Sequence, residues 1–353
     1  MIKSILIKNF RLFENLEIKD LNRINLIVGN NNSGKSTILE SIFLNIGATN
    51  AVLPLRINAF RNYDRLDDIT FRSFFHNFNI KDPIEIKIER RKPKEFRNLS
   101  ISPLFSQKKE KNIQLSEIIK EEQTAVNGST IEGLHHKFEI KKSSKGNYNS
   151  HYADIRKNGL SFKLEQPTNY EDKFRGIFLA PRSTPLDNAR RLGKLQFEKK
   201  TDDIVKVLKN IEPNLKSIFL LDNNYIFADI GLKNLIPLSL MGDGINRILT
   251  IILALYDNQD GVVLIDEIEN GFHYKSLNVL WKTIFEASQL FNVQVFATTH
   301  SWENIMTFVQ ISNELTFDDV KLFRVETQKN KNQVIEYDYK LLQNSLESEW
   351  EIR

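Results

Sequence analysis

The stretch LIVGNNNSGKSTILESI, residues 26–42, begins as an apolar strand, crosses three asparagines and two glycines, and continues as an amphipathic helix. Within it, residues 29–36 read G-N-N-N-S-G-K-S, which fits the phosphate-loop pattern G-x-x-x-x-G-K-[ST]. Gly29 and Gly34 allow the backbone to curl so that successive N–H groups converge on an anion. The helix predicted over residues 35–46 adds the positive end of its dipole. The stretch therefore predicts a nucleotide-binding loop between a strand and a helix.

The side chains of this loop have separate expected roles. Lys35 is expected to reach the β- and γ-phosphates of ATP and to act in catalysis, and the Ser36 hydroxyl to complete the shell of Mg²⁺. Further contacts to the nucleotide are expected from the rest of the loop and the residue after it, namely Gly29, Asn30, Asn31, Asn32, Ser33, Gly34 and Thr37. The alternative, a glycine-rich turn that matches by accident, does not explain the strand and helix on either side.

A second motif, GVVLIDEIENGFHY, covers residues 261–274. Asp266 ends an apolar strand, so its carboxylate is expected at the carboxyl edge of a sheet, where ligands bind in open α/β folds. There it can hold Mg²⁺, through water. Glu267 is placed to orient or deprotonate a water that attacks the γ-phosphate. An ordinary acidic turn is the alternative for the Asp-Glu pair alone.

A third motif, VQVFATTHSWEN, covers residues 293–304 and repeats this arrangement on another strand. His300 follows the strand end, where it can contact the γ-phosphate or position the attacking water. A lone histidine is more often structural or simply exposed. The position of His300 after an apolar strand favours the catalytic interpretation.

The composition sets limits on the protein class. The chain has 353 residues, no cysteine and a formal net charge of +4, which excludes disulfides and thiolate zinc sites and is consistent with a reducing compartment. Its N-terminus has no h-region or cleavage site of a signal peptide, and the longest apolar stretch, near residues 248–256, is too short to span a bilayer. We therefore expect a cytoplasmic protein with no membrane partner.

The order of segments predicts an α/β fold. In the last third, apolar strands alternate with amphipathic helices, which is typical of a mostly parallel sheet covered on both faces. Short alternating runs such as IEIKIER and HKFEIKK predict an antiparallel, β-rich insertion instead. We expect a core N-terminal lobe over residues 1–81, the charged insertion over 82–176, and a core C-terminal lobe over 177–353.

The insertion also carries a cluster of basic residues that could bind a phosphate backbone. The cluster consists of Lys87, Arg90, Arg91, Lys92, Lys94 and Arg97, followed by Lys108, Lys109 and Lys111. Interleaved acidic residues weaken this interpretation, and a solvated charged surface is the alternative.

Together these motifs resemble the RecF/SMC branch of the ABC-type ATPases, and in particular stand-alone prokaryotic ATPases related to the OLD (overcoming-lysogenization-defect) proteins. The resemblance rests on IKNFRLFENLEI near the N-terminus, the phosphate loop, LIDEIENGFH as Walker B and D-loop, and ATTHS as the switch-histidine segment. It covers the first fifty residues and about residues 235–308. No Q-loop glutamine is identified.

The resemblance implies a homodimer or higher oligomer in which two subunits dock head to tail around ATP. Each nucleotide would be capped by the LMGDGI turn of the other subunit, through Gly242, Asp243 and Gly244, where a helix N-terminus is suited to an anion. The usual signature serine is replaced by Gly242, with Ser239 three residues upstream. Arg11 corresponds to a basic residue that lies near the nucleotide in relatives.

The resemblance also suggests a role. OLD proteins carry a C-terminal Toprim nuclease domain, whereas here few residues follow VKLFRVE. An ATPase that controls a separately encoded nuclease, as in two-gene anti-phage systems such as PARIS, is therefore expected. A RecF-like DNA-binding repair ATPase and a nucleotide-gated scaffold with little turnover remain as alternatives.

Overall fold

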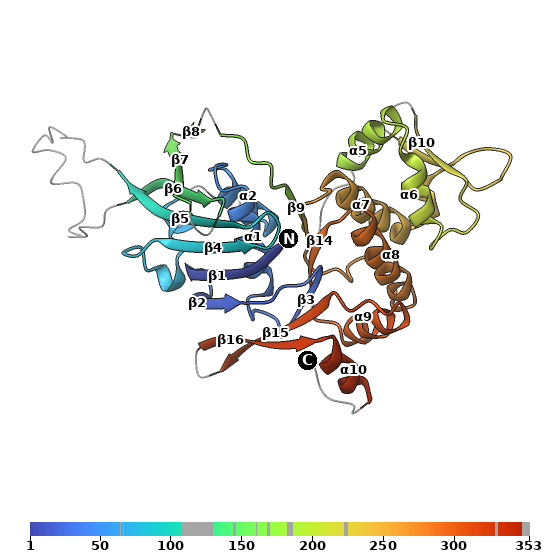
Figure 1. Ribbon diagram of the computed structural model, residues 1–353. Coiled ribbons are helices and arrows are strands. Elements are labelled where there is room, and N and C mark those ends of the chain that lie inside the picture. Colours follow the sequence, from blue (N-terminus) through green and yellow to red (C-terminus); the bar gives the residue numbers. More distant parts are fainter. Residues whose placement is uncertain are drawn as a thin grey trace, which may run out of the picture.

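The computed structural model describes residues 1–63, 65, 67–106, 130–143, 146–159, 161–167, 170–181, 186–221, 225–328 and 331–347. Two large sheets lie on either side of helix α1 (Lys35–Ile46), and further helices cover the outer face of one of them (Figure 1). This arrangement confirms the predicted α/β class. It also places the helix that follows the phosphate loop at the centre of the molecule.

The first sheet has six strands in the order β16-β15-β3-β14-β13-β9. All its pairings are parallel except that between β15 and β16. Its strands are β3 (Ile24–Val28), β9 (Gly176–Leu179), β13 (Val262–Ile265), β14 (Gln294–Thr299), β15 (Val320–Gln328) and β16 (Lys331–Asp338). Strands β3, β13 and β14 are buried along their whole length, as strands covered on both faces should be. The predicted mostly parallel sheet is confirmed.

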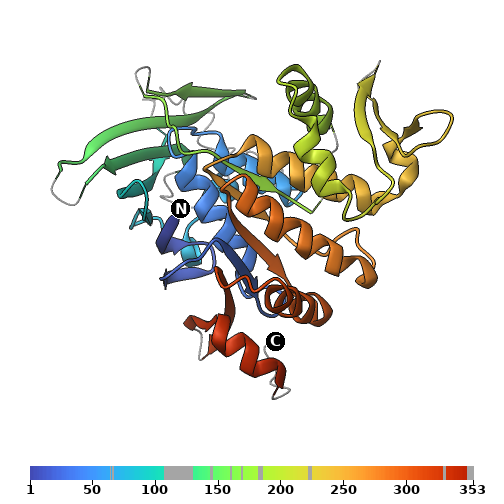
Figure 2. The ribbon, with the colours of Figure 1, turned by 45° about the vertical axis from the view of Figure 1, so that its right-hand side comes forward.

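Alternate side chains of β3 enter two different hydrophobic cores. Ile24, Leu26 and Val28 face α7 (Asp243–Asp257), α8 (Leu277–Leu290) and α9 (Trp302–Glu314), which Figure 2 shows side by side. Ile27 faces the other way, into the core around α1. This alternation follows from the two-residue period of a strand. It fixes the phosphate loop, which leaves β3 and enters α1, at the edge shared by both cores.

The second sheet is antiparallel, in the order β2-β1-β4-β5-β6-β7-β8. It contains β1 (Ile2–Phe10), β2 (Phe13–Ile18), β4 (Ile84–Arg90), β5 (Glu95–Phe105), β6 (Ile131–Lys141), β7 (Asn149–Asn158) and β8 (Ser161–Glu165). The strands of the segment predicted as an insertion thus form one sheet with β1 and β2, because β1 pairs with β4. The domain boundaries given above stay a prediction.

The remaining elements are short. Between α1 and β4 lie α2 (Leu53–Phe60), α3 (Asp68–Arg72) and η1 (His76–Phe78), and α10 (Tyr339–Glu347) follows β16. After β9 come α5 (Leu186–Phe197), α6 (Thr201–Leu208), the small sheet β10 (Ser217–Leu221), β11 (Tyr225–Asp229) and β12 (Ile236–Pro237), and η3 (Leu238–Met241). Strands β10 and β11 form an antiparallel hairpin, and its turn residues lie outside the described ones. No described helix is long and apolar enough to cross a membrane.

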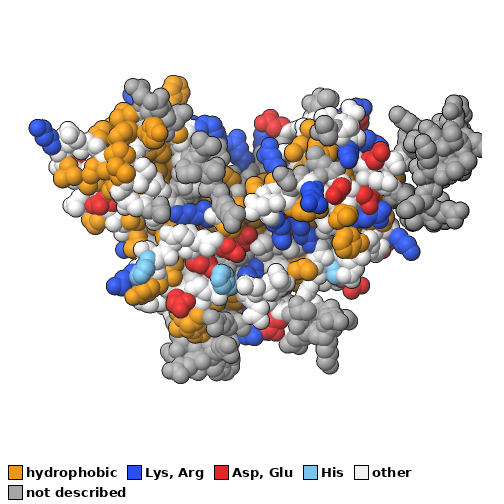
Figure 3. All heavy atoms as spheres, turned by 180° about the vertical axis from the view of Figure 1, so that it is seen from behind, with side chains coloured by type: hydrophobic (Ala, Val, Ile, Leu, Met, Phe, Trp, Pro, Cys, Tyr) orange, Lys and Arg blue, Asp and Glu red, His pale blue; other side chains and the backbone are white. Residues whose placement is uncertain are grey.

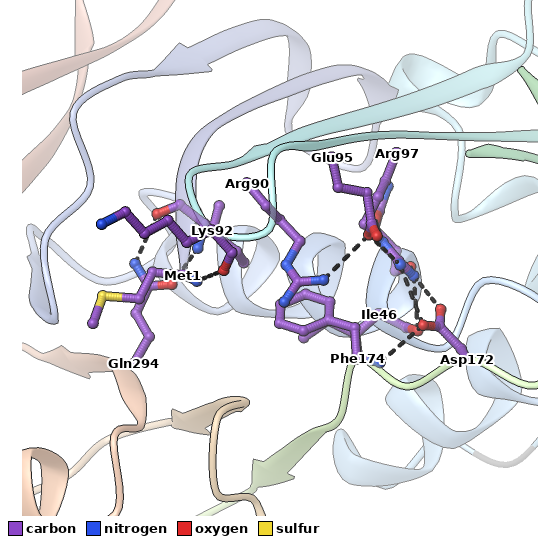
Figure 4. A network of polar contacts seen from close by, with 11 residues as sticks. Met1, Ile46, Arg90, Lys92, Glu95, Arg97, Asp172, Phe174 and Gln294 are labelled. Carbon is purple, nitrogen blue, oxygen red and sulfur yellow. Dashed lines mark hydrogen bonds and ion pairs between the residues drawn. The ribbon is translucent and has the colours of Figure 1, made fainter. Parts of the chain in front are cut away.

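A buried arginine joins the antiparallel sheet to α1. Arg97, on β5, is 1% exposed and donates to the carbonyl oxygens of Asn45 and Ile46 at the C-terminal end of α1, at 3.1 and 3.3 Å. Figure 4 shows its guanidinium between the carboxylates of Glu95 and Asp172, with which it is ion-paired. The contact stabilises the negative end of the helix dipole.

The same network corrects part of the interpretation of the basic cluster as a phosphate-backbone surface. Arg97 and Arg90 are buried rather than exposed, and both pair with Glu95. Lys87 pairs with Glu85 at 3.1 Å. Three of the first six residues of the cluster are exposed: Arg91, Lys92 and Lys94, on the turn between β4 and β5. Lys108, Lys109 and Lys111 lie outside the described residues.

His136 makes the stability of the fold depend on pH. Its side chain is buried on β6 and its Nδ1 lies 3.2 Å from the carbonyl oxygen of Ala48, after α1. Burial lowers the pKa of His136 from 6.5 to about 4, because a charged imidazole would be desolvated. The unfolded chain therefore binds a proton at His136 below pH 6.5, whereas the folded chain binds one only near pH 4. The stability that the neutral His136 contributes at higher pH is lost as pH falls from 6.5 to about 4.

We expect His136 to cost about 2 kcal/mol of stability at pH 5 and about 3 kcal/mol at pH 4, relative to pH 7.5. Urea unfolding of the unaltered chain and of His136→Gln, which stays neutral, measures this as the difference between their stability–pH curves. Parallel curves between pH 4 and 6.5 would contradict the assignment.

Candidate functional site

The phosphate loop has the backbone that its glycines predict. Gly29 and Gly34 have φ angles of 144° and 102°, and Asn32 has a φ of 63°. A Cβ atom on Gly34 would lie 2.4 Å from the ring of Phe13, on β2. Glycine is therefore required at position 34 both by the backbone conformation and by the packing of the loop against the antiparallel sheet.

Lys35 begins α1 and its ammonium folds back over the loop. Its Nζ donates to the carbonyl oxygens of Gly29 and Asn30 at 2.8 and 2.9 Å. Burial lowers the pKa of Lys35, and the carboxylates of Asp266, Glu269 and Glu267 offset part of that effect. An ammonium has three donor hydrogens, so one remains for a further acceptor.

Asp266 joins the loop to two neighbouring strands. Its Oδ1 accepts from the hydroxyl of Ser36 at 2.9 Å and from that of Thr298, on β14, at 2.6 Å. Mg²⁺ is usually bound by one or two protein oxygens together with phosphate oxygens and water. Ser36 and Asp266 fit this pattern. Thr298 is a site residue that the sequence analysis did not identify, although it lies in the quoted ATTHS segment.

Glu267 stands in an unusual backbone conformation. Its φ is 47°, in the left-handed region that non-glycine residues rarely adopt. Two contacts hold it there: its N–H donates to Thr298 Oγ1 at 2.8 Å, and Asn270 Nδ2 donates to its Oε2 at 2.7 Å. Strained backbone that the surroundings enforce is frequent at active sites. The carboxylate is thereby fixed beside Asp266.

His300 and the acidic residues come together as the sequence predicts. The imidazole is half exposed, and its Nδ1 lies 3.2 Å from Oε1 of Glu269. Glu269 was not identified from the sequence. Its position two residues after Glu267 gave no reason to distinguish it from a surface acid.

These groups surround one cavity of about 410 Å³ at the carboxyl edge of the parallel sheet. Its lining contains most of the predicted loop, both Walker B acids and the switch histidine. It also contains three residues that were not predicted, Leu12, Arg61 and Thr298. The full set is Leu12, Asn31, Asn32, Ser33, Gly34, Lys35, Ser36, Thr37, Arg61, Asp266, Glu267, Thr298 and His300. The buried hydroxyl of Ser33 has no hydrogen-bond partner among the described residues. A cavity with unused donors, an ammonium and a guanidinium is suited to a polyphosphate.

Arg11 and Arg61 share one buried carboxylate. Glu40, on α1, lies 2.8 Å from Arg11 Nε and 2.7 Å from Arg61 Nε. Arg11 also donates to Asn58, and its side chain does not line the cavity, whereas that of Arg61 does. The structure therefore places Arg11 behind the cavity wall, with Arg61 as the arginine that reaches the cavity.

The LMGDGI turn is not part of this cavity. Gly242, with a φ of 108°, immediately precedes α7 and is exposed, and no described neighbour lies within 4 Å of a Cβ placed on it. Gly244 faces Phe272, whose ring would lie 3.9 Å from its Cβ. The side chain of Asp243 lies outside the described ones. The structure thus does not bring Gly242 and Gly244 to the loop of their own chain.

Comparison with protein families gives a match to the AAA ATPase domain over residues 1–305. The chain belongs to this family. An ATP/GTP phosphatase of Helicobacter pylori is 28% identical over 351 residues, which cover 92% of each chain. The RecF replication and repair protein of Clostridium acetobutylicum is 48% identical over 42 residues, 12% of each chain.

The fold also has solved counterparts. A crystal structure of an SMC head bound to the C-terminal winged-helix domain of ScpA superposes with a TM-score of 0.51, at 13% identity, and covers 97% of this chain and 99% of that one. At this identity the likeness concerns the fold alone. The family match makes the chain an ATPase, and its fold is that of SMC head domains.

Proposed function

We propose that this chain is a Mg²⁺-dependent ATPase that dimerises around ATP and controls a separate effector, a nuclease, in the anti-phage defence of a prokaryotic cytoplasm. The observation that carries the enzymatic part is the single cavity in which the phosphate loop, Asp266, Glu267 and His300 meet. The defence role rests on the resemblance of the motifs to stand-alone OLD-like ATPases.

Each side chain of the cavity has a distinct proposed task. Residues 29–37 hold the phosphates, with Lys35 as their main cationic partner. Ser36 and Asp266 would hold Mg²⁺, which when bound neutralises charge on the phosphate oxygens. Glu267 accepts the proton of the attacking water, and Asn270 keeps its carboxylate in place. His300 contacts the same water.

The partner proposed for the LMGDGI turn is a second copy of the chain. Gly242 and Gly244 do not line the cavity of their own chain, so they are available to cap a nucleotide held by another. Exposed hydrophobic side chains gather nearby, over α5, α6 and the β10–β12 sheet (Figure 3). They include Leu240, the first residue of the turn, which is 77% exposed, together with Tyr225, Leu232 and Leu235. Apolar patches of this kind mark interaction surfaces.

ATP-dependent dimerisation is the expected result. We expect Glu267→Gln with ATP and Mg²⁺ to sediment as a dimer in analytical ultracentrifugation, and as a monomer with ADP. Leu240→Asp in the same background is expected to weaken this dimer at least about tenfold, because the charge would be desolvated in the interface. Ile69→Asp is the matched control, since Ile69 is 59% exposed on α3, which packs on β6 of the antiparallel sheet. A monomer under every condition would contradict the proposed assembly.

The effector part is tested in cells with the same variants. Phage plating is compared for bacteria that express the chain with the reading frame encoded beside its gene. Protection that requires both chains, and that Lys35→Ala and Leu240→Asp abolish, supports the proposal. Protection that is independent of these variants, or absent, would overturn the defence role while leaving the ATPase intact.

The two alternatives give different results in these experiments. A RecF-like DNA-repair ATPase predicts DNA binding whose affinity falls steeply with salt; the burial of Arg90 and Arg97 removes part of the surface on which this alternative rested. The match to RecF over 42 residues keeps it in consideration. A nucleotide-gated scaffold predicts tight ATP binding with little hydrolysis, which single-turnover measurements distinguish.

A further inference from the structure

One carboxylate, that of Glu269, contacts both the imidazole and the backbone of His300. Oε1 of Glu269 lies 3.2 Å from His300 Nδ1 and also accepts from the backbone N–H of His300 at 3.2 Å. Glu269 follows β13 and is mostly buried, whereas His300 follows β14 and is half exposed. The carboxylate therefore bridges the two strand ends that line the cavity.

A buried chain of hydrogen bonds determines which group of Asn304 faces the carboxylate of Glu269. The indole N–H of Trp281, on α8, donates to Asn304 Oδ1, on α9, at 2.6 Å. Indole is only a donor, so the amide oxygen of Asn304 must face it. The NH₂ group of Asn304 then points the other way, 3.0 Å from Thr299 Oγ1 and 3.4 Å from Glu269 Oε2. Trp281 and Asn304 are fully buried, so water cannot replace these hydrogen bonds.

Both oxygens of Glu269 thus face donors, the backbone N–H of His300 at Oε1 and the NH₂ group of Asn304 at Oε2. An unprotonated Nδ1 of His300 would set its lone pair against that carboxylate. The ring must therefore carry its proton on Nδ1, and when neutral it keeps its lone pair on Nε2. A carboxylate selects the tautomer of an imidazole in the same way in Ser-His-Asp triads.

We propose that Glu269 is a positioning residue that holds His300 in the Nδ1–H tautomer, so that Nε2 accepts a hydrogen bond from the attacking water. This inference rests on the proposed role of His300 in hydrolysis. In this tautomer the neutral ring has no proton to offer a γ-phosphate oxygen from Nε2. Of the two roles expected for His300, contact with the γ-phosphate and positioning of the water, the hydrogen-bond chain from Trp281 favours the second.

The tautomer is measured directly, without nucleotide, by NMR of protein labelled with ¹⁵N-histidine. His300 signals are identified by their loss in His300→Gln. We expect a protonated, pyrrole-type Nδ1 and an unprotonated Nε2 in the unaltered chain. Glu269→Ala is expected to move the ring to the Nε2–H form, whereas Glu269→Gln, whose carbonyl oxygen can still accept from His300, keeps most of the Nδ1–H form.

Kinetics provide the second readout. Glu269→Ala is expected to lower kcat about 10- to 100-fold, the range known for loss of the outer hydrogen bond of a metal-bound imidazole, with KM for ATP changed less than about threefold. Glu269→Gln should restore most of kcat. The matched control is Asp154→Ala. His135 Nδ1 lies 2.5 Å from Asp154 Oδ1 on the antiparallel sheet, away from the cavity. In this variant the tautomer of His135 should change without an effect on ATP hydrolysis.

The outcomes separate this inference from the proposed function. If His300→Gln hydrolyses ATP normally, the proposed role of His300 fails, whatever its tautomer. If His300→Gln is impaired but Glu269→Ala retains both the Nδ1–H signal and the normal kcat, the positioning role of Glu269 alone is overturned. Loss of kcat in Glu269→Ala without a change of tautomer would also overturn it.

Discussion

Replacing Glu267 by glutamine is expected to lower the kcat of ATP hydrolysis by about two to four orders of magnitude while ATP binding is retained. Glutamine has nearly the same shape and can keep the contact with Asn270, but it cannot take a proton from water. The groups that contact the phosphates, Lys35 and Ser36, are unchanged. Phosphate release at steady state measures kcat, and titration with a fluorescent ATP analogue measures affinity.

Two further variants give this result its meaning. Glu17→Gln, at a half-exposed glutamate paired with Lys19 on the antiparallel sheet, makes the same chemical change away from the cavity and should hydrolyse ATP normally. Lys35→Ala should lose ATP binding itself, because the phosphates lose their main cationic partner. If Glu267→Gln retained a rate within about threefold of the unaltered chain, Glu267 would have no part in the chemistry.

Local sequence was sufficient to predict the residues of the cavity that lie in strand–turn–helix contexts. The loop at 29–36 carries its own conformational requirement in its glycines, and Asp266 and His300 each follow an apolar strand. Since carboxyl ends of parallel strands share one edge of a sheet, three separate segments could be placed together without knowing their contacts. The structure brings them to one cavity.

The residues that were missed depend on contacts between distant segments. Arg61 reaches the cavity because Glu40, 21 positions earlier, orients it. Glu269 is distinguished from other surface acids only by the donors of His300 and Asn304, which come from another strand and helix. No periodicity or motif contains this information, because each pairing is decided by how α1, β13 and β14 pack.

In the basic cluster, the sequence suggested exposed residues where the structure has buried ones. Six cations within eleven residues suggest an exposed patch, but strand alternation sends Arg97 inward, to the end of α1, and the carboxylates of Glu95 and Asp172 surround it there. A count of charges along the chain does not tell which face of a strand carries them. Leu99 and Ile101, two and four residues after Arg97 on β5, are buried on the same face of the strand as Arg97.

Replacing Arg97 by methionine is expected to lower the free energy of unfolding by about 3–5 kcal/mol. The substitution keeps an apolar stem but leaves Asp172 without its guanidinium and Glu95 with Arg90 alone. It also removes the donors from the last carbonyl groups of α1, the helix that carries the phosphate loop at its other end. The midpoint of urea unfolding measures the change.

The control is Arg156→Met, because Arg156 is 40% exposed and lies 3.8 Å from Asp154; pairs of this kind contribute less than about 1 kcal/mol. Arg97→Met combined with Asp172→Leu should recover part of the loss, since the second change removes one of the carboxylates left uncompensated. If Arg97→Met fails to fold, Arg97→Lys still tests the argument: it keeps the charge but has fewer donors, and should be intermediate in stability. Equal stability of Arg97→Met and Arg156→Met would show that the joint between the antiparallel sheet and α1 is held by packing rather than by this guanidinium.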